Sequence, residues 1–422
     1  MGEDGVVRPD QVSLGVLVTA VSRDAVDTAV AAHGVGAKRS DSKLPAHVTA
    51  YLTMGLCLFA EDDYTEVATK VTGSLSAWGC WDAGWSVPTS SGITQARKRL
   101  GPDVLAEVFE QVAEPVATPL TRGAWLRGRR LVAIDGFDVD LPDSKENAAR
   151  FGYAGSGQGR SAFPKARVVA LAECGTHAFV AAEIDRYSVG EKTLANRLYP
   201  RLHADELLTA DRNFYSFDAW GLAASSRAAL LWRAPTGLAL PVVTVLPDGT
   251  YLSVLVNPAI RSARRRAALL DTAQQIAQGE LDLEALDPQQ AHLVRVVEYD
   301  VPDRDGNGTG ELIVLLTTIL APDPERGAPA DELAAAYHQR WEEETGNDQL
   351  KTHLRGPGRV LRSRLPELVI QEIWAWLLVH YALSVLGARA AEAADLDPDR
   401  ISYTRVLRTA RRTATGTAGF PP

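Results

Sequence analysis

Residues 131–140 read LVAIDGFDVD, and this stretch decides the fold expected for the rest of the chain. Four apolar residues, Leu131 to Ile134, run directly into Asp135, as in a strand that is buried on both faces. A carboxylate at the end of such a strand cannot stay unpaired, because an isolated buried charge is too costly. A metal ion held with further carboxylates would compensate it. Asp211 and Glu344 are the candidate partners.

The composition predicts a soluble globular protein of two or three domains, with 422 residues, 46% hydrophobic and 23% charged. The longest apolar run, 373–386, is interrupted by His380 and predicts a buried helix, and we expect no signal peptide. Three scattered cysteines predict neither a disulfide framework nor a zinc site, which fits a reducing cytoplasm.

The formal net charge of −9 argues against a nucleic-acid partner if the charge is spread evenly. Basic clusters nevertheless occur at 97–99, 127–130, 264–266 and 411–412. A single cluster of this kind is more often a solvated surface than a DNA contact.

Residues 44–120 have a helical pattern. Ser90 can cap a short helix, Gly101 can end it and Pro102 can open the next. With Arg97, Lys98 and Arg99 on one helix, this segment fits a helix-turn-helix DNA reader or a small helical bundle with a basic face.

From residue 131 the pattern changes to strands. We expect strands at 131–140, 166–174 and 177–184, a helix at 191–202, a strand at 207–211, a helix at 216–225 and a strand at 229–234. Three antiparallel strands followed by alternating helix and strand are typical of a mixed α/β ribonuclease H-like sheet.

The remaining segments complete the predicted organisation. We expect a helical N-terminal DNA-binding domain at 1–125, a ribonuclease H-like core at 126–236 and 326–386, a β-rich insertion at 237–325 and a helical tail at 387–422. An apolar helix at 365–386 should pack under the sheet.

In this kind of sheet the first and fourth strands are neighbours, so Asp135 and Asp211 would meet, and a helix across that edge would add Glu344. Three close carboxylates need cations, and hard oxygen ligands favour Mg²⁺ or Mn²⁺. Two such ions roughly 4 Å apart can activate a water or a 3′-hydroxyl and stabilise the leaving oxygen of a phosphodiester.

Tyr337, Arg340, Glu344 and Lys351 share one face of a helix predicted over 333–350 and its continuation. A hydroxyl, a guanidinium and an ammonium beside a metal-binding carboxylate form a phosphate-binding edge. The alternative is an ordinary amphipathic helix with an Arg340–Glu344 salt bridge. Glu343 is the main rival of Glu344, and Asp138, Asp140 and Glu342 are expected at the surface.

This spacing of tyrosine, arginine, glutamate and lysine resembles the signature of the DDE transposases of the insertion-sequence-four group. Asp135 within IDGFDVDLPDSKEN resembles the first aspartate of that family, and Asp211 within TADRNFYS resembles the second. The resemblance covers residues 40–410 and includes the β-rich insertion between the second aspartate and the glutamate.

The resemblance implies a dimeric, magnesium-dependent bacterial enzyme that cuts double-stranded DNA at the terminal inverted repeats of an element and joins the freed 3′-hydroxyls to target DNA. In members of the family a DNA hairpin can form, with a base flipped onto an aromatic residue. Trp232 and Trp341 are the stacking candidates, with core packing as the alternative for each. The alternative functions are a DDE nuclease without strand transfer and a non-catalytic DNA-binding protein.

Overall fold

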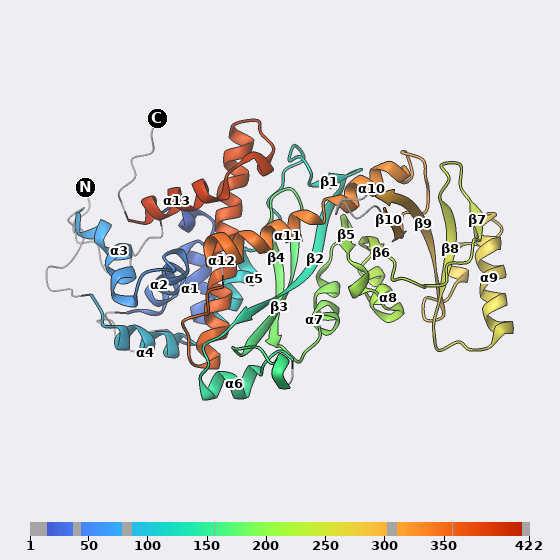
Figure 1. The fold of residues 1–422 in the computed structure, drawn as a ribbon. Coiled ribbons are helices and arrows are strands. Elements are labelled where there is room, and N and C mark those ends of the chain that lie inside the picture. The colour runs from blue at the N-terminus through green and yellow to red at the C-terminus, as the bar shows by residue number, and fades with distance from the viewer. Residues whose placement is uncertain are drawn as a thin grey trace.

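The computed structural model describes residues 15–36, 44–77, 87–155, 157–301, 310–356 and 358–415. Figure 1 shows an elongated molecule in which a long mixed sheet occupies the middle and one end, and a bundle of helices occupies the other end. The long helix α12 (Pro366–Ala393) stands between the bundle and the sheet.

One sheet runs through the molecule in the order β4-β3-β2-β5-β6-β10-β9-β8-β7, with β1 paired to β2. Its strands are β1 (Trp125–Leu126), β2 (Arg129–Asp140), β3 (Lys165–Glu173), β4 (Ala178–Arg186), β5 (Glu206–Ala210), β6 (Ala229–Arg233), β7 (Thr244–Val245), β8 (Tyr251–Val256), β9 (Ala291–Val301) and β10 (Glu311–Thr317).

The first five long strands confirm the predicted ribonuclease H-like core. β2 pairs antiparallel with β3 and β3 with β4, while β2 pairs parallel with β5 and β5 with β6. The predicted strand positions differ from the observed ones by one or two residues, because the strands coincide with uninterrupted apolar runs between turn residues.

The β-rich insertion extends this same sheet. β10 pairs antiparallel with β6, opposite Arg233, Trp232 and Leu231, and β9, β8 and β7 follow in order. Helix α9 (Ala263–Ala277) packs on β8 at the far end. Joining the insertion edge to edge satisfies the backbone groups that β6 would otherwise leave open.

Helices cover both faces of the sheet. Alternate residues of β2, Val132 and Ile134, pack with α7 (Glu191–Leu198) and α8 (Phe217–Ser225) on one face. Leu131 and Ala133 pack with α10 (Ala330–His338) on the other face. The alternation follows from the strand period of two residues.

The helical end forms one apolar cluster around α12. Its other members are η2 (Gly15–Thr19), α1 (Arg23–Ala32), α2 (Ala46–Leu58), α3 (Tyr64–Ala77), α4 (Ser90–Leu100), α5 (Asp103–Val112) and α13 (Tyr403–Ala414). The cluster continues into Phe137 and Val139 of β2, so these helices share a core with the sheet. The domain boundary expected at residue 125 remains a prediction.

Short elements complete the chain: α6 (Lys145–Phe151), η3 (Gly157–Gly159), η4 (Tyr199–Arg201), η5 (Arg212–Phe214), η6 (Leu283–Ala285), α11 (Trp341–Asp348), η7 (Gln349–Leu354) and η8 (Pro398–Arg400). The single helix predicted over 333–350 is wrong in detail. It is divided at Gln339–Arg340 into α10 and α11, and it ends in the π-helix η7, which carries Lys351.

Arg97 corrects another expectation, since it was predicted to contact DNA. Its side chain is 1% exposed. Its guanidinium donates to Gln371 Oε1 at 2.8 Å, Tyr64 Oη at 2.9 Å, Ser363 Oγ at 3.1 Å and the Leu368 carbonyl at 3.1 Å. Arg97 therefore joins α4 to α12 and is not available to a DNA phosphate.

Helix α12 is long and apolar enough to cross a membrane, yet 94% of its apolar window is buried within the structure. The apolar helix predicted at 365–386 to pack under the sheet forms the core of the helical end, and it contacts the sheet at β4.

We expect Arg97→Ala to lower the free energy of unfolding by about 3 kcal/mol or more, because it leaves several buried acceptors without a donor. Chemical denaturation measures the effect. Arg99→Ala is the matched control: Arg99 lies two residues away and is exposed, so its removal should cost less than about 0.5 kcal/mol. Equal losses for the two variants would contradict the assigned role of Arg97.

Candidate active site

The register between β2 and β5 places Asp135 beside Asp211. Ile134 and Ala210 are Cα partners in this parallel pair, and the two aspartates are the next residues along the strands. Neighbouring strands are about 4.8 Å apart, so the two Cα atoms lie about 5 Å from each other. The predicted meeting of the two carboxylate-bearing residues therefore follows directly from the sheet.

The carboxylates of this region fall into two classes. Asp138 binds Arg167 at 3.1 Å and Asp140 binds Lys165 at 2.7 Å. Asp135 and Asp211, in contrast, have no hydrogen bond or ion pair to their carboxylates within the described ranges. Both are partly buried. Two adjacent, partly buried and unpaired carboxylates repel one another unless a cation lies between them.

Strand parity separates the two classes. Asp135 lies on the same face of β2 as Leu131 and Ala133, which pack with α10, whereas Asp138 and Asp140 have the opposite parity. Figure 1 shows α11 crossing in front of β2 on the way from α10 to α12. Glu344 belongs to α11, so its helix lies across the face that carries Asp135.

The donor chemistry fits a divalent cation. Carboxylate oxygens are the ligands that Mg²⁺ and Mn²⁺ prefer, and two unpaired aspartates supply them. The side chains of Glu342, Glu343 and Glu344 lie outside the described residues, and among the described ones no cluster of three metal-ligating groups occurs. The third ligand therefore remains a prediction.

Tyr337 and Arg340 support the start of α11. Both are buried, and the Arg340 guanidinium lies 5.8 Å from the Tyr337 ring centroid and 5.4 Å from that of Trp341. Burial raises the pKa of Tyr337, Arg340 opposes the rise and the Asp211 carboxylate adds to it. Tyr337 is thus close to Asp211, but neither Tyr337 nor Arg340 presents its polar group to DNA in this arrangement.

Lys351 extends the site along β2. Its Nζ lies 5.1 Å from the centroid of the Phe137 ring, and Phe137 is two residues beyond Asp135 on the same face. A cation over an aromatic ring keeps its charge available on the open side. Lys351 therefore lies on the face of β2 that carries Asp135, and its phosphate contact remains a prediction.

Glu191 and Arg167 are site neighbours that the sequence interpretation missed. A Cβ at Gly136 would lie 2.9 Å from Glu191 Cγ, so a larger residue after Asp135 would displace the Glu191 side chain. Arg167 lies 3.8 Å from the Glu191 carboxylate. Burial raises the pKa of Glu191, and Asp135 and Asp138 raise it further. A glycine directly after the first aspartate was the available signal.

The remaining predicted residues have different surroundings. Trp232 is fully buried, with its ring 5.4 Å from Trp220 and 5.5 Å from Tyr199. The core-packing alternative is therefore confirmed for Trp232, and its candidacy for base stacking is wrong for this structure. Trp341 is 47% exposed beside Arg340, and its stacking on a flipped base remains a prediction. Lys98 and Arg99 are exposed on α4, remote in the fold from the carboxylates.

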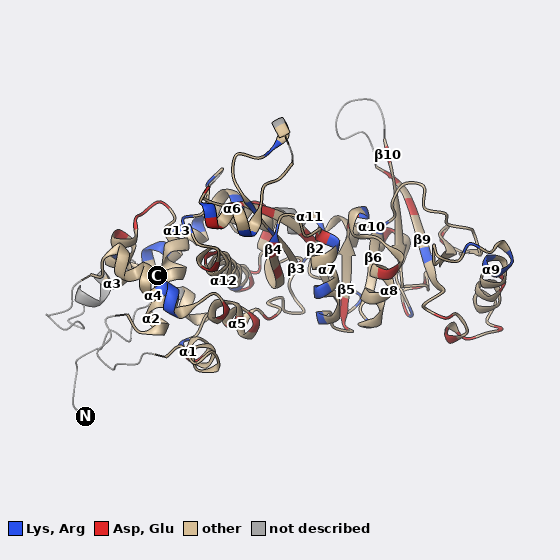
Figure 2. Cartoon of the chain, turned by 90° about the horizontal axis from the view of Figure 1, so that it is seen from below, with Lys and Arg blue, Asp and Glu red and all other residues tan. Residues whose placement is uncertain are grey.

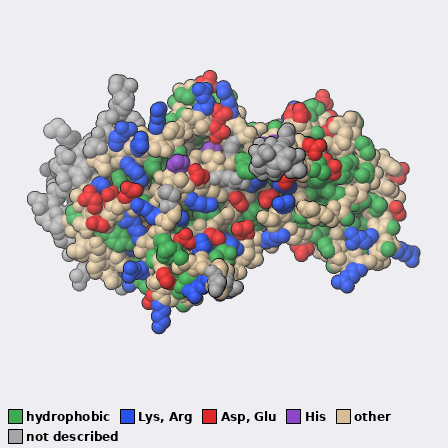
Figure 3. All heavy atoms as spheres, in the orientation of Figure 1, with side chains coloured by type: hydrophobic (Ala, Val, Ile, Leu, Met, Phe, Trp, Pro, Cys, Tyr) green, Lys and Arg blue, Asp and Glu red, His purple; other side chains and the backbone are tan. Residues whose placement is uncertain are grey.

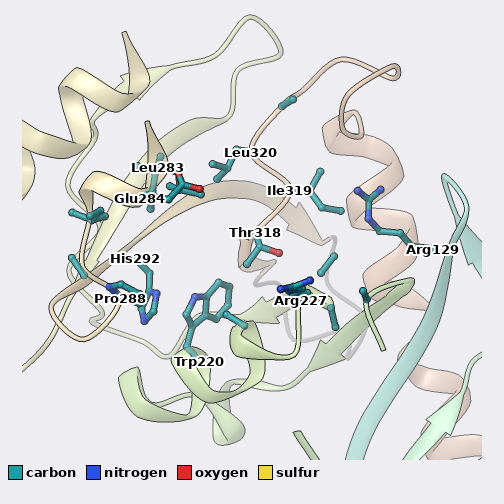
Figure 4. A pocket seen from close by; sticks show the side chains of 18 of the residues that line it. Arg129, Trp220, Arg227, Leu283, Glu284, Pro288, His292, Thr318, Ile319 and Leu320 are labelled. Atoms are coloured by element: carbon teal, nitrogen blue, oxygen red, sulfur yellow. The ribbon is translucent and has the colours of Figure 1, made fainter. Parts of the chain in front are cut away.

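A cavity of about 820 Å³ lies at the opposite ends of the parallel strands. Figure 4 shows Trp220, Arg227 and Thr318 lining it from α8, from the turn after α8 and from the end of β10. The five residues of β5 separate it from Asp211 by about 17 Å. Its size alone does not make it the place of the chemistry, because the unpaired carboxylates are elsewhere.

Charge is distributed in small patches. Figure 2 shows Lys and Arg positions on α4, α6 and α9, along the whole length of the molecule. Figure 3 shows basic and acidic side chains interspersed on the face seen in Figure 1. An overall charge of −9 therefore coexists with separate local positive patches.

Two protein families match this chain. Residues 11–110 match the family described as insertion element 4 transposase N-terminal, and residues 126–381 match the transposase DDE domain. Transposase InsG for insertion sequence element IS4 of Escherichia coli (strain K12) is 25% identical over 355 residues, covering 83% of this chain and 71% of that protein.

Among solved structures, the piggyBac transposase in a synaptic complex with hairpin DNA has a TM-score of 0.45 and 10% sequence identity. The superposition covers 95% of this chain and 79% of that chain.

Mg²⁺ should stabilise the protein by binding to the native state. At a Mg²⁺ concentration ten times its dissociation constant, we expect a melting temperature about 2 °C higher than in EDTA. Asp211→Asn should remove this shift, and it should raise the melting temperature in EDTA because the repulsion with Asp135 is relieved. Asp140→Asn, on the opposite face of the same strand, should keep the Mg²⁺ shift. Loss of the shift in both variants would argue against a site at Asp135 and Asp211.

Proposed function

Because this chain belongs to the DDE transposases of the insertion-sequence-four family, we propose that it moves an insertion sequence by a cut-and-paste route in which Asp135, Asp211 and Glu344 are the catalytic metal ligands. It is a DNA transposase that uses divalent metal to cleave phosphodiesters. The observation that carries the residue assignment is the unpaired pair of aspartates in register on neighbouring strands, with Asp135 inside β2 and Asp211 directly after β5. The expectation that Asp135 ends its strand is wrong, because β2 continues to Asp140.

Mg²⁺ is the proposed metal, with Mn²⁺ able to substitute. Bound divalent ions at such a site make water or a 3′-hydroxyl a better nucleophile and offset the charge on the leaving oxygen. In this proposal the oxygen ligands are the carboxylates of Asp135 on β2, Asp211 after β5 and Glu344 on α11. A site built on strands holds its ligands in a fixed geometry, which favours catalysis by positioning.

DNA contacts come from separate elements in this proposal. Lys351 binds a phosphate beside the carboxylates, and Lys98 and Arg99 bind the backbone farther along the duplex. Tyr337 and Arg340 hold the start of α11 and reach a phosphate only if their packing opens. Trp341 is the proposed stacking surface for a flipped base.

A homodimer on two DNA ends is part of the same proposal. Each chain carries one pair of aspartates, whereas an insertion sequence has two terminal inverted repeats that must be cut in one event. Two copies held together on the repeats would provide one site for each end. The substrate DNA of a bacterial element lies in the nucleoid, so we propose that the protein acts in the cytoplasm.

Asp211→Ala and Glu344→Ala should each reduce strand cleavage by roughly a thousandfold or more and leave end binding nearly intact, because each removes a metal ligand. The measurement is excision from a supercoiled plasmid that carries the element ends, together with a DNA-binding titration. Asp271→Ala is the control, since Asp271 is an exposed carboxylate on α9. Loss of end binding in the two site variants would contradict their assignment.

The same assay separates transposition from simple cleavage. Products in which the excised 3′ ends are joined to a second plasmid support strand transfer. Cleavage without joined products would favour the nuclease alternative.

Lys351→Ala should weaken binding of an end-bearing duplex by about three- to tenfold and reduce the slope of log K against log salt by about 1, since one phosphate contact is lost. Titrations at several salt concentrations give both quantities. Arg389→Met removes an exposed cation from α12 and should change neither. An unchanged slope in Lys351→Ala would exclude the proposed phosphate contact.

A further inference from the structure

Arg355 is a buried cation that the fold does not compensate. It directly follows the π-helix η7 and is 7% exposed. Its Nε and Nη1 atoms have no hydrogen-bond partner within the described part of the chain. Its backbone N–H donates to the Leu350 carbonyl at 3.0 Å, so the main chain is held while the guanidinium is not.

The surroundings of Arg355 are apolar. It lines a cavity of only about 10 Å³, room for one water at most. The other lining residues are Phe137, Val139, Leu350, Leu361, Ile373, Trp376 and Leu377. Burial lowers the pKa of Arg355, although Asp140 and Glu372 oppose the effect at longer range.

Both of those acids already have other partners. Asp140 binds Lys165 at 2.7 Å. Glu372 accepts hydrogen bonds from the Arg362 and Ser363 backbone N–H groups at 3.1 and 3.0 Å and from Ser363 Oγ at 2.5 Å. Arg355 is therefore left without a carboxylate of its own.

Two other buried arginines of the same chain, Arg97 and Arg295, have hydrogen-bond acceptors around their guanidinium groups. Arg97 donates to four acceptors from three other segments of the chain. Arg295 binds Asp248, Thr250 Oγ1 at 2.9 Å and the carbonyls of Ala321 and Ala328 at 3.0 and 2.7 Å. Removing a charge from water without such partners is costly, so the state of Arg355 is an exception that calls for a functional explanation.

The position of Arg355 supplies that explanation. Phe137 forms one wall of its cavity and also carries Lys351 over its ring. Phe137 lies two residues from Asp135 on the same face of β2, a rise of about 7 Å. Arg355 therefore shares Phe137 with the lysine expected to bind a phosphate, and Phe137 is two residues along β2 from the unpaired carboxylate of Asp135.

We infer that Arg355 is a second phosphate-binding residue of the active site, stored under the surface in the DNA-free protein and released to the DNA backbone next to Lys351 when DNA binds. The ligand is a phosphodiester group of the bound strand. A guanidinium forms two parallel hydrogen bonds to such a group, which replaces the partners it lacks in the apolar cavity. The π-helix before it is the segment expected to rearrange, since π-turns are rare and concentrate at functional sites.

This inference rests on the proposed function, because it assumes that DNA lies along Lys351. It makes a combined prediction for Arg355→Met, which keeps an unbranched apolar stem in the cavity and removes the guanidinium. The melting temperature of the DNA-free protein should rise by about 2 °C or more, because a buried uncompensated charge is removed. Binding of an end-bearing duplex should weaken by roughly tenfold, and the slope of log K against log salt should fall by about 1.

The experiment measures melting temperature and salt-dependent DNA binding for wild type, Arg355→Met, Lys351→Ala and the surface control Arg389→Met. A rise in melting temperature with unchanged DNA binding would overturn the inference, and so would a fall in melting temperature with unchanged binding. If only Lys351→Ala changes DNA binding, Arg355 does not bind a phosphate, but the proposed phosphate contact of Lys351 stands. If neither variant changes DNA binding, the proposed phosphate contact of Lys351 is wrong as well.

Arg355→Lys resolves the case in which Arg355→Met loses both stability and DNA binding. Lysine keeps the positive charge without the planar fork of donors. Under the inference, Arg355→Lys restores the salt slope of the wild type and recovers only part of the affinity. A slope that stays low in Arg355→Lys would overturn the inference.

Discussion

The parallel pairing of β2 with β5 is the constraint on which the rest of this structure depends. It is the one contact that brings Asp135 next to Asp211, which are far apart in the sequence. A shift of one residue in this register would move Asp135 to the face covered by α7 and α8. Burying the Asp135 carboxylate on that apolar face without a partner would be costly, and this cost opposes the shift.

The acidic residues around this pairing show how a fold separates structure from chemistry. Asp138 and Asp140 are neutralised by Arg167 and Lys165 across the β2–β3 ladder. Asp135 and Asp211 lie side by side on two interior strands of the sheet, where no described basic side chain pairs with them. Repulsion between the two is a cost to the metal-free protein, and it is the kind of local strain expected where a cation has to bind.

Arginine has two distinct uses in this chain. Arg97 and Arg295 are buried and saturated with acceptors, and they join segments that are distant in the sequence. Arginines on α9 and in other small patches are exposed and available to a polyanion. A negative net charge is therefore compatible with DNA binding, because local patches and not the sum of charges meet the phosphates.

The sequence by itself determined the order of strands and helices, the ribonuclease H-like core and the placement of Asp135 beside Asp211 on neighbouring strands. It did not show that β2 continues past Asp135 to Asp140. These features depend on the local hydrophobic periodicity and on the order of segments, and both can be read from the amino-acid sequence. Only the tertiary structure decided that Arg97 and Trp232 are buried, that the insertion continues the sheet and that Arg355 lacks a partner. The environment of a long polar side chain depends on residues hundreds of positions away, as Gln371 is from Arg97, and no local pattern encodes it.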